Sequence, residues 1–401
     1  GRRRLAAGGS FLVSSTALTK TAPAVLMADE PQELAPIAAS KRIDAMDVLR
    51  GFALIGILLM NVEWFNRPIA SLGGFDDTLV GFDHAFGWLV RCFVEGKFYK
   101  LFALLFGMGF AVMLIRAKEA GRPFSAWFVR RMLVLFVLGL LHMIFLWNGD
   151  ILHDYAFSGL VLLGWILLLR KERLRRFDNP KSFLKIALIW LSLPLVAATV
   201  AAIGFSVAYD HDKLTEQWER DNRVVAVVEA RMELPVEESP EDDGEDEDEA
   251  ESDEPEQELT EEEEFELLVS ETVESEREKE TKIEEETAAF TQTSYWEATK
   301  FRFWGMLNWL KFTPVLTFMI LLPIFLLGYW FIASGVLRNH REHQHIFRPM
   351  AWLGMSFGLF FTVGGLMVIS SPPTEISGPL QSTGGMLFFV GQYALAAGYL
   401  G

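Results

Sequence analysis

The stretch FYKLFALLFGMGFAVMLI, residues 98–115, decides the fold class of this chain. It contains a single charged side chain, that of Lys100. A helix of this length extends about 27 Å at 1.5 Å per residue, and the hydrocarbon core of a bilayer is about 30 Å thick. We therefore predict that residues 98–115 form a transmembrane helix.

Apolar runs of the same character recur on both sides of this stretch, separated by charged links. They are residues 48–62, 127–147, 151–169, 183–208, 312–336, 350–370 and 386–400. The pattern predicts an all-α protein, a polytopic membrane helix bundle with about 7–8 transmembrane helices. The run at residues 82–95 is shorter than these and mixes apolar with charged side chains. We therefore predict an interfacial or re-entrant helix there.

The negative charge of the chain is concentrated in one insert. The 401 residues are 51% hydrophobic with a mean hydropathy of +0.24, yet the formal net charge is −17. Residues 207–290 hold 35 acidic and 7 basic side chains, so the remainder has a net charge of +11. This distribution excludes a compact soluble enzyme, and Cys92, the only cysteine, excludes an intrachain disulfide and a cysteine-rich metal site.

The two ends of the chain and its two apolar parts suggest a division into domains. We predict a disordered N-terminal tail over residues 1–40, with the true start at Met27. A first membrane half of five helices follows over residues 41–208. Residues 297–401 form a second membrane half, which we expect to be truncated because the last run, 386–400, is too short to span a bilayer.

Between these halves, residues 209–296 are predicted to form an extracytoplasmic acidic loop of low complexity. Residues 237–264 contain 19 acids and no base, and such a segment cannot bury enough apolar surface to fold alone. We therefore expect a disordered acidic loop, although the flanking residues 223–232 and 261–286 could be helical. A solvated spacer is the simplest role, and cation buffering or a partner contact are the alternatives.

Basic side chains predict the orientation of the bundle. Lys and Arg are abundant in residues 116–131, 170–185 and 338–348. These links lie on one side of the membrane if each segment between them spans once. By the positive-inside rule this side and the N-terminus are cytoplasmic, and the acidic loop is on the opposite side.

The first candidate site lies at the start of the first span. At about 100° per residue, Asp47, Arg50 and Asn61 fall within one broad stripe of a helix. Arg50 could hold a phosphate near the cytoplasmic face. Alternatively, Asp47 and Arg50 form an ion pair at the helix entry that only fixes topology.

The second candidate site surrounds the turn between two spans. His142 lies about a turn and a half before Trp147, and Asp150 follows the Asn148-Gly149 pair. Spans joined by so short a turn are antiparallel neighbours, so His142 can approach Asp150 or His153. A carboxylate beside an imidazole suits an oriented general base, a proton relay or part of a metal site. Asp150 could instead simply cap the next helix.

Two lysines at the outer end of residues 98–115 form the third candidate site. Lys97 and Lys100 could hold an anionic substrate, but snorkelling to the membrane surface is the simpler explanation. His340, His343 and His345 lie in a basic loop that we interpret as solvated. We therefore predict no metal site.

Three ordered motifs resemble those of the YeiB-like bacterial membrane proteins, a domain family of unassigned function. The first is DVLRGFAL at residues 47–54 with Asn61, and the second begins with GKF at residues 96–98. The third comprises the following residues: Arg130, Arg131, Gly139, His142, GDIL at 149–152, Tyr155 and Gly159. The resemblance covers roughly residues 41–401 and implies a multi-pass protein of the bacterial inner (cytoplasmic) membrane.

The first motif is also similar to that of heparan-α-glucosaminide N-acetyltransferase and related transmembrane acyltransferases. Those enzymes pass an acyl group from cytosolic acyl-CoA to an acceptor on the far side of the membrane, using a histidine. By analogy we expect acyl-CoA as co-substrate and a small molecule, glycan or lipid as acceptor. A proton- or ion-coupled transporter or flippase, or a non-catalytic membrane scaffold, are the alternatives.

The acyltransferase hypothesis gives each candidate residue a role. His142, oriented by Asp150, is the catalytic base. The substrate-binding candidates are Asp47, Arg50, Asn61, Lys97, Arg130, Arg131 and Tyr155. The partners that we expect are the lipid bilayer and the acceptor but no nucleic acid, and a homo-oligomer is compatible with the sequence.

Overall fold

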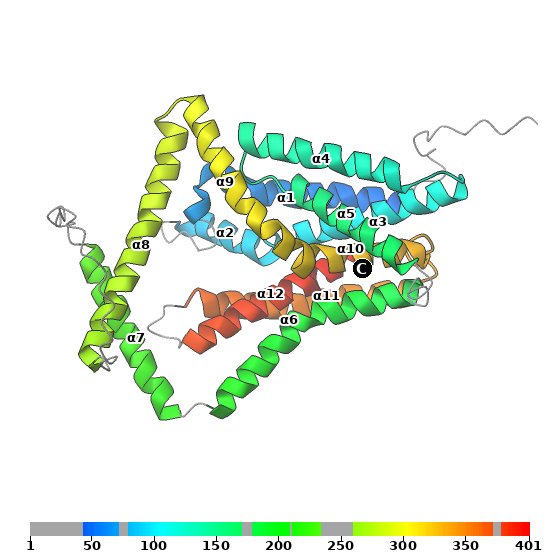
Figure 1. The fold of residues 1–401 in the computed structure, drawn as a ribbon. Helices are drawn as coiled ribbons and strands as arrows, with labels where there is room; N and C mark the ends of the chain where they lie inside the picture. Colours follow the sequence, from blue (N-terminus) through cyan, green and yellow to red (C-terminus); the bar gives the residue numbers. More distant parts are fainter. Residues whose placement is uncertain (1–42, 72–78, 171–178, 209–210, 234–259, 372–377) are drawn as a thin grey trace, which may run out of the picture. The chain divides into compact units, whose positions relative to one another are not determined.

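The structure is a computed structural model that describes residues 43–71, 79–170, 179–208, 211–233, 260–371 and 378–401. The predicted tail at residues 1–40, with Met27, lies outside the described residues. The first part of the chain forms α1 (Asp44–Asn66), the short turn η2 (Ile69–Ser71), α2 (Gly81–Phe93), α3 (Phe98–Glu119), α4 (Ser125–Phe145), α5 (Leu152–Leu169) and α6 (Pro180–Ala208). The second part forms α7 (His211–Met232), α8 (Glu261–Thr291), α9 (Tyr295–Leu316), the π-helical turn η4 (Thr317–Leu321), α10 (Leu322–Ala333), α11 (Gln344–Ile369) and α12 (Gly378–Leu400) (Figure 1).

These elements confirm the predicted fold class, since every element in the described ranges is helical and none is a strand. Six stretches within those ranges are long and apolar enough to cross a membrane: Asp44–Asn66, Gly81–Glu119, Ser125–Phe145, Leu152–Leu169, Tyr295–Ala333 and Gln344–Ile369. They include six of the eight predicted runs. The other two, residues 183–208 and 386–400, are helical in α6 and α12 but are not among the six stretches.

The predicted short helix at residues 82–95 corresponds to α2. Its 13 residues extend about 20 Å, which is less than a hydrocarbon core. A turn separates it from α3, and within that turn Gly96 has φ +73°, a left-handed conformation that ends the helix. The turn therefore places Lys97 and Lys100 at the beginning of a new helix.

At the centre of the bundle, α3 and α10 are packed closely together. A Cβ atom added to Gly107 would overlap the carbonyl oxygen of Phe325, and one added to Gly328 would overlap that of Leu104. Small residues permit such close backbone approach between membrane helices. Because α3 is apolar around its whole circumference, it is buried on most sides.

Aromatic contacts show which helix ends lie together. Phe110 in α3 packs against Phe128 near the start of α4, with ring centroids 4.8 Å apart, and against Tyr329 in α10 at 6.2 Å. Tyr329 also contacts Phe183 at the start of α6, at 4.7 Å. The three basic links therefore adjoin one end of the bundle, which we call the basic end. This agrees with the predicted common side of the links.

The opposite end of the bundle is formed by other termini. Phe65 near the end of α1 packs against Trp147 with ring centroids 4.7 Å apart. The hydroxyl of Tyr295, at the start of α9, donates to the carbonyl oxygen of Phe145 at 2.7 Å. Arg302 Nε donates to the carbonyl oxygen of Ile144 at 3.0 Å. The turn after α4 therefore lies at the end where α9 begins.

The flanks of the acidic loop, which the sequence allowed to be helical, form α7 and α8. Val224 and Val228 of α7 pack with Val269 of α8 in a small apolar cluster, and Thr260 and Glu263 form a capping box at the start of α8. Helical spacing of apolar residues and a good N-cap stabilise these flanks despite their acidic composition. Residues 234–259, which hold most of the acidic run 237–264, lie outside the described residues.

Candidate functional site

The candidate site begins with a histidine and an aspartate on two neighbouring helices. His142 lies in the last turn of α4, and Asp150 lies in the turn that leads into α5. His142 Nδ1 is 2.9 Å from Asp150 Oδ2, within ion-pair distance. The Asp150 side chain is 6% exposed and that of His142 is 37% exposed. The predicted approach of His142 to Asp150 is therefore observed, and one side of the imidazole remains accessible.

The other oxygen of Asp150 stabilises the start of α5. Asp150 Oδ1 accepts a hydrogen bond from the backbone N–H of Leu152 at 2.6 Å. The two roles left open by the sequence, capping and pairing with His142, are thus performed by different oxygens of one carboxylate. Such a carboxylate is fixed in orientation from two sides.

A glycine allows these two helices to approach. A Cβ added to Gly139, one turn before His142, would lie 2.6 Å from the backbone nitrogen of His153 and 3.1 Å from Asp150 Oδ1. Any side chain at position 139 would therefore push α4 away from α5. The close approach at Gly139 is what lets the His142 imidazole reach Asp150.

Burial raises the pKa of Asp150 above its ordinary value. The backbone N–H of Leu152 and the nearby His142 act in the opposite direction, but desolvation is the larger effect. An ionised carboxylate at this position is therefore costly.

A second histidine and aspartate lie deeper, between α5 and α9. His153 and Asp154 are fully buried, with His153 Nε2 3.2 Å from Asp154 Oδ1. Asp154 Oδ1 accepts from the hydroxyl of Thr313 at 2.6 Å, and Oδ2 accepts from the indole N–H of Trp309 at 3.2 Å. The hydrogen bonds that the Asp154 carboxylate accepts thus come from α9. Of the two predicted partners of His142, Asp150 is the one found within ion-pair distance.

Two further buried polar side chains, Ser158 of α5 and Thr317 of η4, contact each other. The hydroxyls of Ser158 and Thr317 are 2.8 Å apart, and both residues are fully buried. Thr317 opens the π-helical turn η4, three residues after Pro314, which lacks a backbone N–H. Such π-helical turns are frequent at functional sites. Thr313 and Thr317 are not predicted from the sequence, in which their only signal is the Thr313-Pro314 pair within an apolar run.

The predicted basic residues do not lie beside His142. Arg130 and Arg131 are exposed in the first turns of α4, so Arg131 is about 17 Å from His142 along the helix axis. Arg50 and Asp47 are exposed near the start of α1, with Arg50 Nη1 3.7 Å from Asp47 Oδ1. All four residues are therefore separated from the His142–Asp150 pair.

Two other predicted site residues are on helices of the bundle. Asn61 is half-buried on α1. Tyr155 is buried in α5, and its hydroxyl donates to the carbonyl oxygen of Tyr99 at 2.9 Å. The Tyr155 ring packs against Phe106 and Phe325, with centroids 5.5 and 5.7 Å away. Tyr155 therefore connects α5 to α3 and α10.

The interpretation that Lys97 and Lys100 snorkel to the membrane surface is wrong. Both side chains are buried. Lys97 Nζ donates to the carbonyl oxygen of Arg91 at 2.6 Å, and Lys100 Nζ donates to Gln392 Oε1 of α12 at 2.6 Å. Acceptors within the bundle direct both ammonium groups inward, and Gln392 is too distant in sequence to be recognised as a partner.

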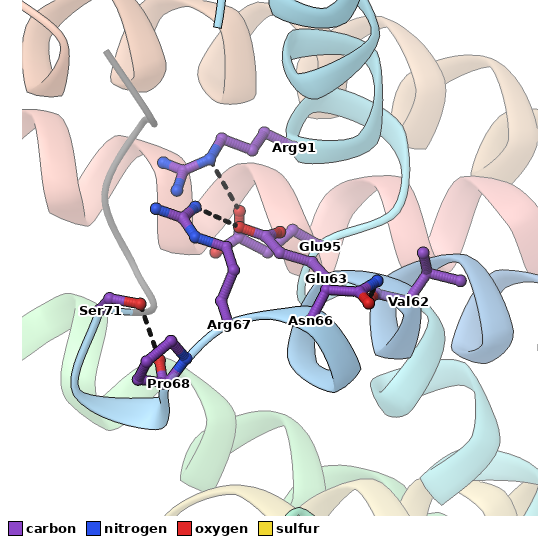
Figure 2. Close-up of polar contacts among 8 residues, drawn as sticks. All are labelled: Val62, Glu63, Asn66, Arg67, Pro68, Ser71, Arg91 and Glu95. Atoms are coloured by element: carbon purple, nitrogen blue, oxygen red, sulfur yellow. Dashed lines mark hydrogen bonds and ion pairs between the residues drawn. The ribbon is translucent and has the colours of Figure 1, made fainter. Parts of the chain in front are cut away.

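Charged residues next to these lysines form a network that the sequence analysis did not single out. Figure 2 shows Glu63 and Arg67, at the end of α1, with Arg91 and Glu95 beside them. Arg67 Nη1 donates to Glu63 Oε1 at 3.3 Å, and Arg91 Nε is 3.8 Å from Glu95 Oε2. Two ion pairs thus adjoin the turn that holds Lys97.

Comparisons with known proteins give relatives without an assigned activity. The chain is 39% identical over 136 residues to the uncharacterised protein YxaH of Bacillus subtilis (strain 168), covering 32% of this chain and 34% of that protein. It is 35% identical over 169 residues to an uncharacterised 39.9 kDa protein from the amylase 3′ region of Bacillus acidopullulyticus, covering 42% and 47%. It is 34% identical over 119 residues to the uncharacterised protein YeiB of Escherichia coli (strain K12), covering 29% of each.

These matches extend over less than half of each relative's length. No protein-family model matches the chain, and no solved structure matches it. The relatives nevertheless agree with the resemblance carried by the three motifs. The homologues of this membrane protein are thus uncharacterised proteins of the YeiB and YxaH type.

Proposed function

We propose that this protein is a transmembrane acyltransferase in which His142, oriented by Asp150, is the general base. The observation that supports this function best is the 2.9 Å contact between His142 Nδ1 and Asp150 Oδ2. At this distance the carboxylate lies close enough to stabilise a positive charge on the imidazole, and in the described residues His142 Nδ1 has no other hydrogen-bond partner. His142 is also the more exposed member of the pair, so a substrate can reach it.

The proposed reaction is balanced in atoms and protons. His142 Nε2 accepts a proton from a hydroxyl or amine of the acceptor, whose oxygen or nitrogen attacks the carbonyl carbon of the acyl thioester. The carbon–sulfur bond breaks, and the thiolate of coenzyme A takes the proton from the imidazolium. The products are an acylated acceptor and a free thiol. Asp150 stabilises the imidazolium during the reaction.

The co-substrate in this proposal is acyl-CoA bound from the basic end. Arg50, Arg130 and Arg131 would bind its phosphates, because guanidinium groups form paired hydrogen bonds with phosphate oxygens. The arm that joins the phosphates to the thioester would then extend along α4 toward His142. Asp47 and Asn61 would border this path on α1. The acceptor, a small molecule, a glycan or a lipid, would approach from the opposite end.

The experiment that tests this function uses the purified protein in liposomes with acetyl-CoA labelled in the acetyl group. Polar lipids and amino sugars are supplied as candidate acceptors. We expect release of free coenzyme A thiol together with transfer of the label to an acceptor. Stable acetyl-CoA in the presence of every acceptor, at protein levels that bind the co-substrate, would contradict the proposal.

A second candidate function is proton-coupled transport. The buried His153–Asp154 pair and the Ser158–Thr317 contact favour it, because buried titratable and hydroxyl groups in membrane helices often form proton relays. Transport predicts that a proton gradient changes the rate at which a cargo crosses the vesicle membrane. The acyltransferase predicts thiol release without any gradient, so the two functions are separable in the same vesicles.

The proposed function requires a defined orientation in the bacterial inner membrane. We expect the basic end and the N-terminus to be cytoplasmic, because the positive-inside rule favours Lys and Arg on that side. A reporter enzyme that is active only in the periplasm should therefore be inactive when inserted at Gly121, between α3 and α4. It should be active at Thr293, between α8 and α9. The reverse pattern would overturn the orientation.

A further inference from the structure

An apolar cavity of about 260 Å³ lies among α3, α6, α10, α11 and α12. Its walls include Leu104, Leu188, Leu327, Trp330 and Met350. Among the described residues that line it, Lys100 is the one charged residue, so this lining combines an apolar body with a single positive group. The volume is close to the lower end of the range typical of small-molecule sites.

The ammonium group of Lys100 is only partly satisfied by the protein. Its side chain is 2% exposed, and Nζ donates to the carbonyl oxygen of Gly96 at 2.8 Å and to Gln392 Oε1 at 2.6 Å. An ammonium group has three donors, so one remains. None of the ion pairs formed by the described residues includes Lys100.

The charges around Lys100 have a positive excess. Lys97 is its buried neighbour, and Arg91 and Arg67 are paired with Glu95 and Glu63. Glu95 interacts electrostatically with both lysines as well as with Arg91, so these two acids face four basic side chains. A buried cation that lacks a full counter-charge is costly, and a bound anion would offset that cost.

Aromatic rings and a glycine hold Lys100 in position. Its Nζ lies 4.6 Å from the ring centroids of Tyr99 and Tyr393 and 5.4 Å from that of Phe389. A Cβ added to Gly96 would overlap the side chain of Gln392, so only glycine leaves room for this partner. The ammonium group is thus fixed at the wall of the cavity.

We propose that this cavity binds an anionic amphiphile, a molecule with an alkyl chain and one carboxylate or phosphate head group. The head group accepts the remaining hydrogen bond of Lys100 and neutralises its charge. The alkyl chain occupies the apolar cavity along α10 and α12, where burial of each methylene contributes about 0.8 kcal/mol. This site uses neither His142 nor Asp150, so it stands independently of the proposed acyl transfer.

The test measures binding of tritiated palmitate to the purified full chain in neutral detergent. Hexadecanol serves as an uncharged competitor with the same chain, and inorganic phosphate serves as a charged competitor without a chain. We expect palmitate to bind at least 10 times more tightly than hexadecanol, and phosphate not to compete. Equal binding of palmitate and hexadecanol, or full competition by phosphate, would overturn the proposal.

Two variants locate the site, and one is the matched control. Lys100→Met keeps the length of the side chain but removes the charge, and we expect at least a 10-fold loss of palmitate affinity. Ala397→Leu keeps Lys100 but fills part of the cavity, so it should also lower affinity if Lys100→Met does not fold. Lys118→Met, at an exposed position, should bind like the unaltered protein. Unchanged binding by folded Ala397→Leu protein would exclude this cavity.

The source of the amphiphile is distinguished by a final competition. Phosphatidylglycerol that displaces palmitate would identify an anionic phospholipid as a ligand, and failure to displace would identify a free fatty acid. Both outcomes support an acidic head group at Lys100. Displacement by zwitterionic phosphatidylcholine to the same extent would contradict it.

Discussion

Replacement of His142 by alanine is expected to lower acyl transfer by about 100-fold or more, since a positioned general base typically contributes 10²–10⁴-fold. Asp150→Asn should cause a comparable loss, because it removes the carboxylate that faces His142 Nδ1 at 2.9 Å. The measurement is the rate of coenzyme A release by each variant at matched amounts of folded protein. His340→Ala, an exposed histidine at the basic end, is the control and should keep full activity.

The double variant tests whether the two residues act together. If Asp150 acts only through His142, the losses are not additive, and the double variant should be little slower than either single variant. Modest losses that add in the double variant would remove the pair from the mechanism. His142→Gln with retained activity would likewise show that the imidazole only packs in the bundle.

The second large effect is expected for Asp154 and concerns stability. Asp154→Ala leaves Thr313 and Trp309 without their acceptor and removes the carboxylate that lies 3.2 Å from buried His153. Removing one member of a buried pair typically costs about 3–5 kcal/mol. The free energy of unfolding in mixed detergent micelles should fall by that amount.

The control for this substitution is Asp47→Ala, which removes an exposed carboxylate from the ion pair with Arg50. Exposed ion pairs contribute about 0–1 kcal/mol, so little change is expected. If the two substitutions cost the same, Asp154 does not connect α5 to α9 in the way that the hydrogen bonds indicate.

Much of the fold could be predicted from the sequence because membrane spans follow from length and hydropathy. The His142–Asp150 contact was also predictable, since a turn of a few residues forces α4 and α5 to be antiparallel neighbours. The contacts of Asp154 were not, because Trp309 and Thr313 lie more than 150 residues away in sequence. No local sequence pattern indicates which polar residues of two distant spans contact each other.

The wrong interpretation of Lys97 and Lys100 came from judging a segment by its position alone. Lys100 lies at the end of a span, where snorkelling is common, but Gln392 of α12 provides an acceptor inside the bundle. The helix that the sequence allowed over residues 261–286 is formed by α8, where a capping box and one apolar face outweigh the acidic composition. In both places a few specific contacts decide the structure, and average properties of the segment do not reveal them.

We propose that the His142–Asp150 pair catalyses transfer of an acyl group to an acceptor at the end opposite to the basic links. This transfer is tested most directly in vesicles whose protein has its basic end outward. Labelled acetyl-CoA is added outside, and the acceptor mixture is enclosed within. We predict labelled product inside the vesicles, reduced about 100-fold by His142→Ala. Equal product with the variant, or label that never leaves acetyl-CoA, would contradict acyl transfer by this pair.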